Sequence, residues 1–178
     1  NFEYSKKVLK FCEKKSINLT YASSASVYGR TTKASYEDWS QISPQNVYAY
    51  SKALFDSYAF NKHNTYNINV TGLRYFNVYG PGESHKIGMT SPVYMFHNQL
   101  IENGKCSVFG AALGYQKGEH SRDFIHVNDA CKITEFFMNK DVSGIFNVGT
   151  GISSSFGKVA ACIINQTCAN YEKKIEYI

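Results

Sequence analysis

Tyr48 and Lys52 are the residues whose types and spacing best suit acid–base chemistry. They lie four positions apart in a stretch with a helical pattern, so their side chains share one face, where the ammonium favours the phenolate form of the tyrosine. A phenol with the ordinary pKa of about 10 needs such help to act as a base near neutral pH. The spacing alone is weak evidence, because the sequence holds 14 tyrosines and Tyr58 with Lys62 repeats the pattern.

The expected positions of the two pairs distinguish them. A helix is predicted over 47–62, after an apolar strand over 17–22 that ends in a run of small residues. Tyr48 and Lys52 open this helix on the side where the strand ends, whereas the second pair lies near its far end. Ser24 follows the strand, where its hydroxyl can hydrogen-bond the substrate oxygen that Tyr48 deprotonates. Spacing alone leaves an alternative open, in which Ser24, Tyr48 and Lys52 only pack in the fold and do no chemistry.

The order of the remaining elements predicts the fold class. Strands that alternate with helices indicate an α/β fold, a doubly wound, Rossmann-like parallel sheet covered on both faces. Ligands bind such sheets at the carboxyl ends of the strands, where Ser23–Ser24, Phe76–Asn77 and Gly149–Gly151 lie. Helices are expected over 2–15, 47–62, 91–103 and 128–140, and a last helix from about Ser155. Strands are expected over 17–22, 68–75, 145–148 and 174–178, and two short strands on either side of the glycine-rich loop 110–118.

Composition excludes several classes of protein. Of the 178 residues 43% are apolar, which suffices for a folded core, and no apolar run approaches the roughly 20 residues of a membrane-spanning helix. The five cysteines form no C-x-x-C pair and the histidines no H-E-x-x-H motif, so we expect reduced thiols packed in the core, a cytoplasmic protein and no metal site. The net charge of +5 favours an anionic partner, but no nucleic-acid-binding motif accompanies it.

Five blocks, in register along the chain, carry a resemblance to a known family. They are YASSASVYG at 21–29, Tyr48-x-x-x-Lys52, RYFNVYGP at 74–81, RDFIHVND at 122–129 and FNVGTG at 146–151. This set resembles the extended short-chain dehydrogenases/reductases that act on nucleotide sugars, the NAD-dependent epimerase/dehydratase family. Segments 46–52, 83–86 and 174–178 are most similar to its branch of ADP-L-glycero-D-manno-heptose 6-epimerases.

The resemblance implies a domain organisation. Residues 1–80 and 122–150 correspond to the back half of the Rossmann-like cofactor domain, and 81–121 and 151–178 to part of a small α/β substrate domain. None of the 13 glycines forms G-x-G-x-x-G or a P-loop. The first phosphate-binding βαβ unit of the family and the C-terminal end of its substrate domain are therefore expected to lie outside this chain.

The resemblance also implies an activity. It is the conversion of ADP-D-glycero-D-manno-heptose to its L-glycero epimer by removal and return of a hydride at C6, with bound NADP (NAD is possible), for the lipopolysaccharide inner core. Tyr48 then takes the hydroxyl proton and also contacts the cofactor, and Lys52 binds the nicotinamide ribose and supports the phenolate. Ser24 hydrogen-bonds the oxygen that is oxidised. Lys86 corresponds to the second acid or base and to a cofactor contact, and a charge clamp or a solvated side chain is the alternative.

Further residues of the site follow from the same resemblance. Asn77 corresponds to a substrate contact, Val78 to a cofactor contact, and a turn-forming asparagine and a packed valine are the alternatives. Arg122 corresponds to the arginine that clamps the nucleotide diphosphate, for which a planar guanidinium is suited. A strand-edge ion pair with Asp123 is its alternative.

The match is looser at other substrate positions. The family pattern Lys-Gly-Ser-Met becomes Lys-Ile-Gly-Met here, so Gly88 offers a backbone contact at best. The substrate histidine of the family aligns with Met95 or, two places on, with His97, which we favour. Phe109, Gly110, Ala111 and Ala112 occupy the place of a substrate loop.

The expected partners are an ADP-heptose substrate and further copies of the chain in a homo-oligomer, with no nucleic acid and no membrane. A related nucleotide-sugar 4-epimerase or 4,6-dehydratase, or an inactive fragment of such an enzyme, stays open as an alternative.

Overall fold

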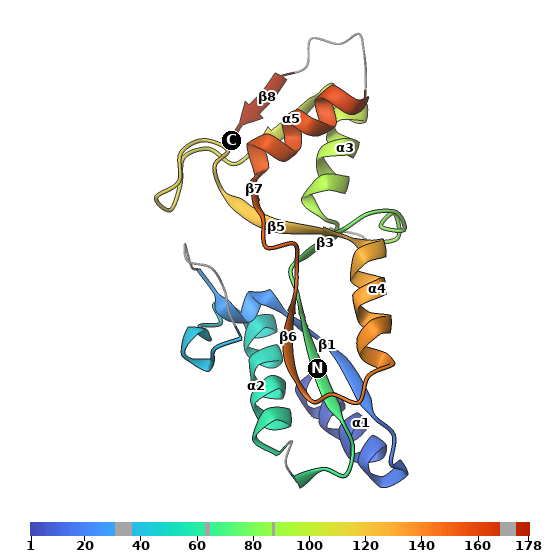
Figure 1. The fold of residues 1–178 in the computed structure, drawn as a ribbon. Helices are drawn as coiled ribbons and strands as arrows, with labels where there is room; N and C mark the ends of the chain where they lie inside the picture. The colour runs from blue at the N-terminus through green and yellow to red at the C-terminus, as the bar shows by residue number, and fades with distance from the viewer. Residues whose placement is uncertain (31–36, 63–64, 87, 168–173) are drawn as a thin grey trace. The chain divides into compact units, whose positions relative to one another are not determined.

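A computed structural model describes the chain except for residues 31–36, 63–64, 87 and 168–173. The chain divides into two compact units (Figure 1), the first made of Asn1–Phe76 and Asp129–Val148 and the second of Asn77–Asn128 and Gly149–Ile178. These bounds differ by a few residues from the predicted domain bounds. Strand pairing explains the difference, because Asn77–Tyr79 pairs with Ser121–His126 and both therefore belong to the second unit.

The first unit contains a parallel sheet of three strands in the order β1-β2-β6. Its elements are α1 (Phe2–Lys15), β1 (Leu19–Ser24), the 3-10 turns η1 (Ala25–Tyr28) and η2 (Trp39–Gln41), α2 (Val47–Lys62), β2 (Val70–Tyr75), α4 (Val127–Met138) and β6 (Gly144–Val148). The part of α4 that belongs to this unit begins at Asp129. The predicted helices and the parallel sheet are confirmed. β1 runs two residues past its predicted end, because Ser23 and Ser24 continue its pairing with β2.

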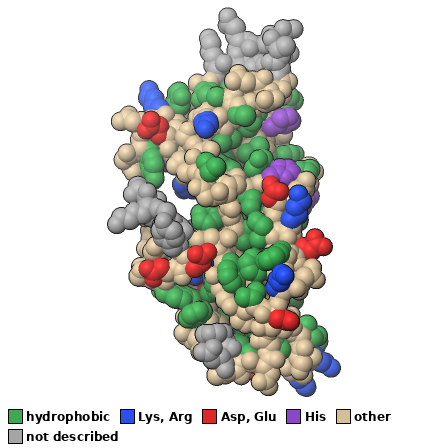
Figure 2. Space-filling model, in the orientation of Figure 1, with side chains coloured by type: hydrophobic (Ala, Val, Ile, Leu, Met, Phe, Trp, Pro, Cys, Tyr) green, Lys and Arg blue, Asp and Glu red, His purple; other side chains and the backbone are tan. Residues whose placement is uncertain are grey.

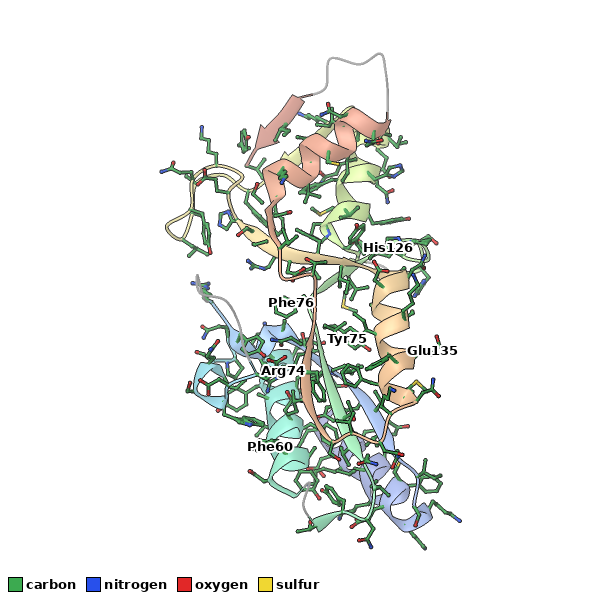
Figure 3. The ribbon with its side chains drawn as sticks, viewed as in Figure 1. Phe60, Arg74, Tyr75, Phe76, His126 and Glu135 are labelled. Carbon is green, nitrogen blue, oxygen red and sulfur yellow. The ribbon has the colours of Figure 1, made fainter. Side chains whose placement is uncertain are left out.

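Helices cover both faces of this sheet. Arg74 and Tyr75 are neighbours in β2, so their side chains point to opposite faces. The Arg74 guanidinium meets Asp56 of α2, with 2.9 Å between Nε and Oδ2, whereas the Tyr75 hydroxyl meets the Thr134 hydroxyl of α4. Arg74 and Tyr75 are labelled in Figure 3. The doubly wound arrangement predicted from the order of elements is therefore present in this unit.

An apolar cluster joins α1 and α2 to the sheet. Leu9 and Cys12 recur at helical spacing on α1 and are buried, so the lysine-rich remainder of that helix lies toward solvent. Complete burial of a side chain such as Leu9 contributes about 1.5–3 kcal/mol. The buried members of the cluster are Leu9, Cys12, Phe55, Ala59, Ile68 and Val70.

The second unit contains two small sheets. β3 pairs in parallel with β5, β5 pairs antiparallel with β7, and β4 pairs in parallel with β8. A strand at 77–79 was not expected, because the sequence predicts a chain break there, and β7 was not expected either. The elements are β3 (Asn77–Tyr79), α3 (Pro92–Asn103), β4 (Lys105–Val108), β5 (Ser121–His126), β7 (Ser153–Ser155), α5 (Phe156–Thr167) and β8 (Lys174–Tyr177).

The ends of α3 follow from its sequence. Ser91 caps the helix by accepting a hydrogen bond from the Tyr94 backbone N–H at 3.2 Å, and Pro92 fills the first helical position. Gly104 ends it in the left-handed conformation with φ +69°. Phe96 and Leu100 of α3 then pack with Phe156 and Ala160 of α5 in the core of the second unit.

The cysteines only partly match the expectation that they fill the core. Cys12 and Cys106 are buried, but Cys131 and Cys162 are exposed, because they lie on the solvent sides of α4 and α5. Cys168 lies outside the described residues. Among the helices of the described residues, none is long and apolar enough to cross a membrane.

Candidate active site

Tyr48 lies in the first turn of α2, with half of its surface exposed. Asn46 starts this helix by accepting a hydrogen bond from the Ala49 backbone N–H at 2.8 Å. The Lys52 ammonium lies 5.7 Å from the centre of the Tyr48 ring, so the two predicted residues are neighbours on one helix face. The phenol is therefore accessible to a ligand and close to a positive charge.

The Lys52 ammonium is anchored to the sheet. It donates a hydrogen bond of 2.7 Å to the backbone carbonyl of Ala22 in β1. Burial lowers the pKa of Lys52 below its ordinary value, and the negative charge of Asp56 opposes that effect. Since an ammonium has three N–H donors, the bond to Ala22 leaves donors for the hydroxyls of a ligand.

Ser24 is the last residue of β1 and the cap of η1. Its hydroxyl accepts a hydrogen bond of 3.2 Å from the Ser26 backbone N–H. Because α2 follows β1 and runs antiparallel to it in a crossover to β2, the first turn of α2 and the end of β1 lie at the same end of the sheet. The structure therefore places Ser24, Tyr48 and Lys52 at the edge predicted for a ligand.

The tyrosine of the second tyrosine–lysine pair has a structural role. Tyr58 packs against the core cluster, with its ring edge-to-face on Phe2 and stacked on Phe55. Position within α2 thus distinguishes the partly buried ring of Tyr58, packed against the core, from the half-exposed ring of Tyr48.

A buried polar network, which was not predicted from the sequence, lies beside these residues. The Asp56 carboxylate is fully buried and forms an ion pair with the buried guanidinium of Arg74. It also accepts hydrogen bonds from the hydroxyls of Tyr21 at 3.0 Å and Ser23 at 2.9 Å. Charged side chains are rarely buried unless they are paired, so Arg74 in the otherwise uncharged strand 70–75 was the available signal.

The ionisation of this network follows from burial and charge. Burial raises the pKa of Tyr21 well above its ordinary value, and Asp56 raises it further, so the phenol stays a hydrogen-bond donor. Burial alone would lower the pKa of Arg74, but its hydrogen bonds to Tyr28 and Asp56 and the charge of Asp56 raise it overall. Arg74 therefore stays positively charged inside the unit.

In the second unit, Asn77 and Val78 lie in β3, where they pair with Phe124 and Ile125 of β5. The strand ends at a crowded glycine, Gly80, with φ +140°. A Cβ atom there would lie 2.7 Å from Val127, so only glycine allows the chain to turn into the segment that carries Lys86.

Glu83 holds that segment. Its buried carboxylate accepts hydrogen bonds from the Ser91 backbone N–H at 2.6 Å, the Ser91 hydroxyl at 2.7 Å and the Gly80 backbone N–H at 3.3 Å. Burial would raise the pKa of Glu83, but these hydrogen bonds and the charge of Lys86 lower it overall, so the carboxylate is ionised. The half-exposed Lys86 ammonium lies 3.7 Å from it.

The other predicted substrate residues of this segment and of α3 are exposed. Gly88 has φ +69° with open space around its Cα, and His97 and Met95 are both exposed on α3. Exposure therefore does not distinguish His97 from Met95 as a substrate contact, and the preference for His97 stays a prediction.

The predicted substrate loop is a hairpin. Ala112 pairs with Tyr115, and the Gly118 backbone N–H donates to the Phe109 carbonyl at 3.0 Å. Gly110 donates its N–H to the Ile178 carbonyl at 2.7 Å, which ties the base of the hairpin to the end of β8. Phe109, Ala111 and Ala112 are exposed.

Arg122 is exposed, and Nη1 of its guanidinium donates to the Ser121 carbonyl at 2.7 Å. The neighbouring Asp123 carboxylate accepts hydrogen bonds from the backbone N–H groups of Thr150, at 2.9 Å, and Gly151, at 2.8 Å. Asp123 therefore organises the Gly149–Gly151 turn, and as a strand neighbour it points to the face opposite to Arg122.

The described residues contain no group of three or more His, Cys, Asp or Glu side chains placed to hold a metal ion, and His63 lies outside them. On the face shown in Figure 2, basic side chains are scattered among acidic and apolar ones. In the first unit, Ser24, Tyr48 and Lys52 offer two hydroxyls and an ammonium as candidate ligand contacts.

Comparisons with known proteins identify the family. Residues 1–149 match the model of the NAD dependent epimerase/dehydratase family. The chain is 43% identical, over 93% of its length, to the ADP-L-glycero-D-manno-heptose-6-epimerase of Thiobacillus denitrificans, of which it covers 50%. These matches confirm the family resemblance that the five sequence blocks indicate.

Solved structures of epimerases match the chain as well. A Helicobacter pylori ADP-L-glycero-D-manno-heptose-6-epimerase matches 99% of this chain with 28% identity and a TM-score of 0.86, and 54% of its own length is covered. A UDP-N-acetylglucosamine 4-epimerase from Methanobrevibacter ruminantium, solved with UDP-N-acetylmuramic acid, matches the whole chain with 25% identity and a TM-score of 0.87, and 55% of it is covered. The chain thus spans about half the length of the relatives it matches, and it belongs to the NAD-dependent epimerase/dehydratase family.

Proposed function

We propose that the protein of which this chain forms part interconverts ADP-D-glycero-D-manno-heptose and ADP-L-glycero-D-manno-heptose at C6. The observation that carries the chemistry is the accessible phenol of Tyr48, 5.7 Å from an ammonium that is itself anchored to Ala22 at the end of β1. The relative that is 43% identical carries the choice of substrate. A heptose epimer of this kind would serve the lipopolysaccharide inner core, and we place the reaction in the cytoplasm.

The residues at the strand ends fit a nicotinamide cofactor, for which we propose NADP, with NAD as the alternative. Lys52 has hydrogen-bond donors left for a ribose diol, and Tyr48 presents its hydroxyl beside them. Val78 and Lys86 of the second unit are proposed as further cofactor contacts. When bound, the nicotinamide supplies the acceptor and donor of hydride.

The chain's own residues handle the proton. Tyr48 takes the proton from the substrate hydroxyl, and the charge of Lys52 stabilises the phenolate that this requires. The Ser24 hydroxyl hydrogen-bonds the same oxygen as its charge changes. Removal and return at opposite faces of C6 need a second acid or base, and we assign this role to Lys86.

Glu83 supports the assignment of Lys86. Its buried carboxylate is hydrogen-bonded to the backbone N–H groups of Gly80 and Ser91, and it gives the Lys86 ammonium an ionic partner 3.7 Å away while leaving that ammonium half exposed. A side chain that has a fixed ionic partner can meet a substrate in a defined place.

The remaining substrate contacts are proposed from the same alignment. Asn77 follows β2 and binds the sugar, and Arg122, exposed beside Ser121, binds the diphosphate as a planar bidentate donor. Gly88, His97 and the hairpin residues Phe109, Gly110, Ala111 and Ala112 complete the substrate site. We expect a homo-oligomer that binds neither nucleic acid nor membranes.

The test is a substrate panel with the full-length protein and either cofactor. We expect each ADP-heptose epimer to yield a mixture of both, resolved by NMR, with UDP-glucose and dTDP-glucose unchanged. Conversion of UDP-glucose at C4, or loss of water from dTDP-glucose, would instead assign the 4-epimerase or 4,6-dehydratase activity. No conversion of either ADP-heptose epimer would overturn the proposed function.

A further inference from the structure

We propose that Asp56 and Arg74 form a positioning pair that holds Tyr48 and Lys52 of α2 in place against the end of β1. The inference deepens the proposed function and rests on it. Neither residue is assigned a contact with substrate or cofactor, and both act through the groups to which they are bonded.

The pair belongs to a polar row that crosses the sheet one residue before its edge. Ser23, Arg74 and Asn147 occupy the same register position in β1, β2 and β6. Nη1 of Arg74 donates to the Tyr28 hydroxyl at 3.0 Å, and this hydroxyl donates to Oδ1 of Asn147 at 2.7 Å. Tyr28 ends the turn that Ser24 begins, so the row also ties down the turn after β1.

Two residues of α2 are hydrogen-bonded to three consecutive residues of β1. Asp56 accepts hydrogen bonds from the side chains of Tyr21 and Ser23, while Lys52, one helical turn earlier, donates to the carbonyl of Ala22 between them. A shift of α2 along β1 would break all three bonds together. The helix that carries Tyr48 therefore has one preferred position relative to Ser24.

Burial of the Asp56–Arg74 pair favours one placement of α2 on β1. The side chains of Asp56 and Arg74 are 0% and 1% exposed, so either charge would be strongly penalised without the other. Apolar packing is non-directional, whereas charge-assisted hydrogen bonds fix an orientation. On the buried side of α2, Ala49 and Ala53 contribute small side chains and Phe55 a large one, and the directional bonds of Asp56 and Lys52 add a defined orientation to this packing.

Gly72 of β2 provides room for the network. A Cβ atom at this position would lie 2.5 Å from the Tyr21 hydroxyl. Glycine therefore allows the phenol to lie across β2 and reach Asp56. The Tyr21 ring is also held by an edge-to-face contact with Phe55, whose centroid is 4.7 Å away.

The pair also acts on the charge of Lys52. The groups that face this ammonium are Tyr48 and Asp56 from α2 and the Ala22 carbonyl from β1, with Arg74 of β2 behind Asp56. The Asp56 charge raises the pKa of Lys52 against the lowering by burial. Without the Asp56 charge the pKa of Lys52 should be lower, so the ammonium should lose its proton at a lower pH.

The test uses the full-length protein with its cofactor and the Asp56→Asn variant. We expect kcat for C6 epimerisation to fall about 10- to 100-fold, as for a misplaced catalytic group, with KM within about threefold. The alkaline limb of the pH profile should move to lower pH, and Asp56→Glu should recover most of kcat and move the limb back. A folded Asp56→Asn protein with the wild-type kcat or an unmoved alkaline limb would overturn the proposal.

Two further variants complete the design. Asp141→Asn is the matched control, because Asp141 accepts hydrogen bonds from Asn18 and Asn69 at the other ends of the strands and should leave kcat and the pH profile unchanged. If Asp56→Asn does not fold, Tyr21→Phe decides, since it removes one hydroxyl that binds Asp56. It should lower kcat about 3- to 10-fold, and an unchanged kcat would refute the positioning role. Full activity of Tyr48→Phe would refute the proposed function itself.

Discussion

The Tyr48→Phe variant of the full-length protein should lose C6 epimerisation by about 100- to 10,000-fold while keeping its stability. The loss is that of a positioned acid–base group. The Tyr48 side chain is half exposed, so removal of its hydroxyl should change the free energy of unfolding by less than about 0.5 kcal/mol. Initial rates with either ADP-heptose epimer and a thermal melt measure the two effects.

Tyr50→Phe is the matched control for this variant. Tyr50 lies on the same helix, two residues on and 57% exposed, so it points away from the face that Tyr48 and Lys52 share. We expect wild-type rates from it. Equal activity in the two variants would show that Tyr48 is an ordinary surface tyrosine.

Lys86→Met should have the second largest effect, a loss of about 100- to 10,000-fold in epimerisation, because the reaction at one face of C6 then lacks its acid or base. The folded structure should tolerate the change, since the Lys86 side chain is 43% exposed and its pair with Glu83 spans 3.7 Å. Rates in both directions, measured beside a thermal melt, test this expectation.

Lys105→Met serves as the control, since Lys105 is 48% exposed in the same unit and pairs with Glu176 at 2.8 Å. It should keep the wild-type rate. If Lys86→Met is as active as Lys105→Met, Lys86 is a solvated lysine, and the second acid or base must be sought elsewhere.

The sequence predicted the elements whose signals are local. The Ser91 cap with Pro92 and the terminal Gly104 gave the bounds of α3, and the alternation of apolar strands with helices gave the doubly wound sheet of the first unit. Tyr48 and Lys52 were located by helical spacing together with their place after β1.

Other features depend on pairing between distant segments and carried no local signal. β3 and β7 have three residues each, too few for a recognisable period, and exist because both pair with β5. A carboxylate such as Asp56 on a helix usually faces solvent, and its bonds to Arg74, 18 positions away, and to Tyr21 and Ser23 of β1 make it structural. Glu83 was missed in the same way, because its partner Ser91 was assigned only to the helix cap.

The fate of the hydrogen at C6 decides whether the proposed hydride transfer takes place. The full-length protein is given ADP-D-glycero-D-manno-heptose with deuterium at C6, and the product is analysed by NMR and mass spectrometry. We predict the L-glycero epimer with deuterium retained at C6, because the hydrogen leaves and returns as hydride while Tyr48 handles only the hydroxyl proton. Deuterium lost to solvent, or no epimer formed, would contradict the account.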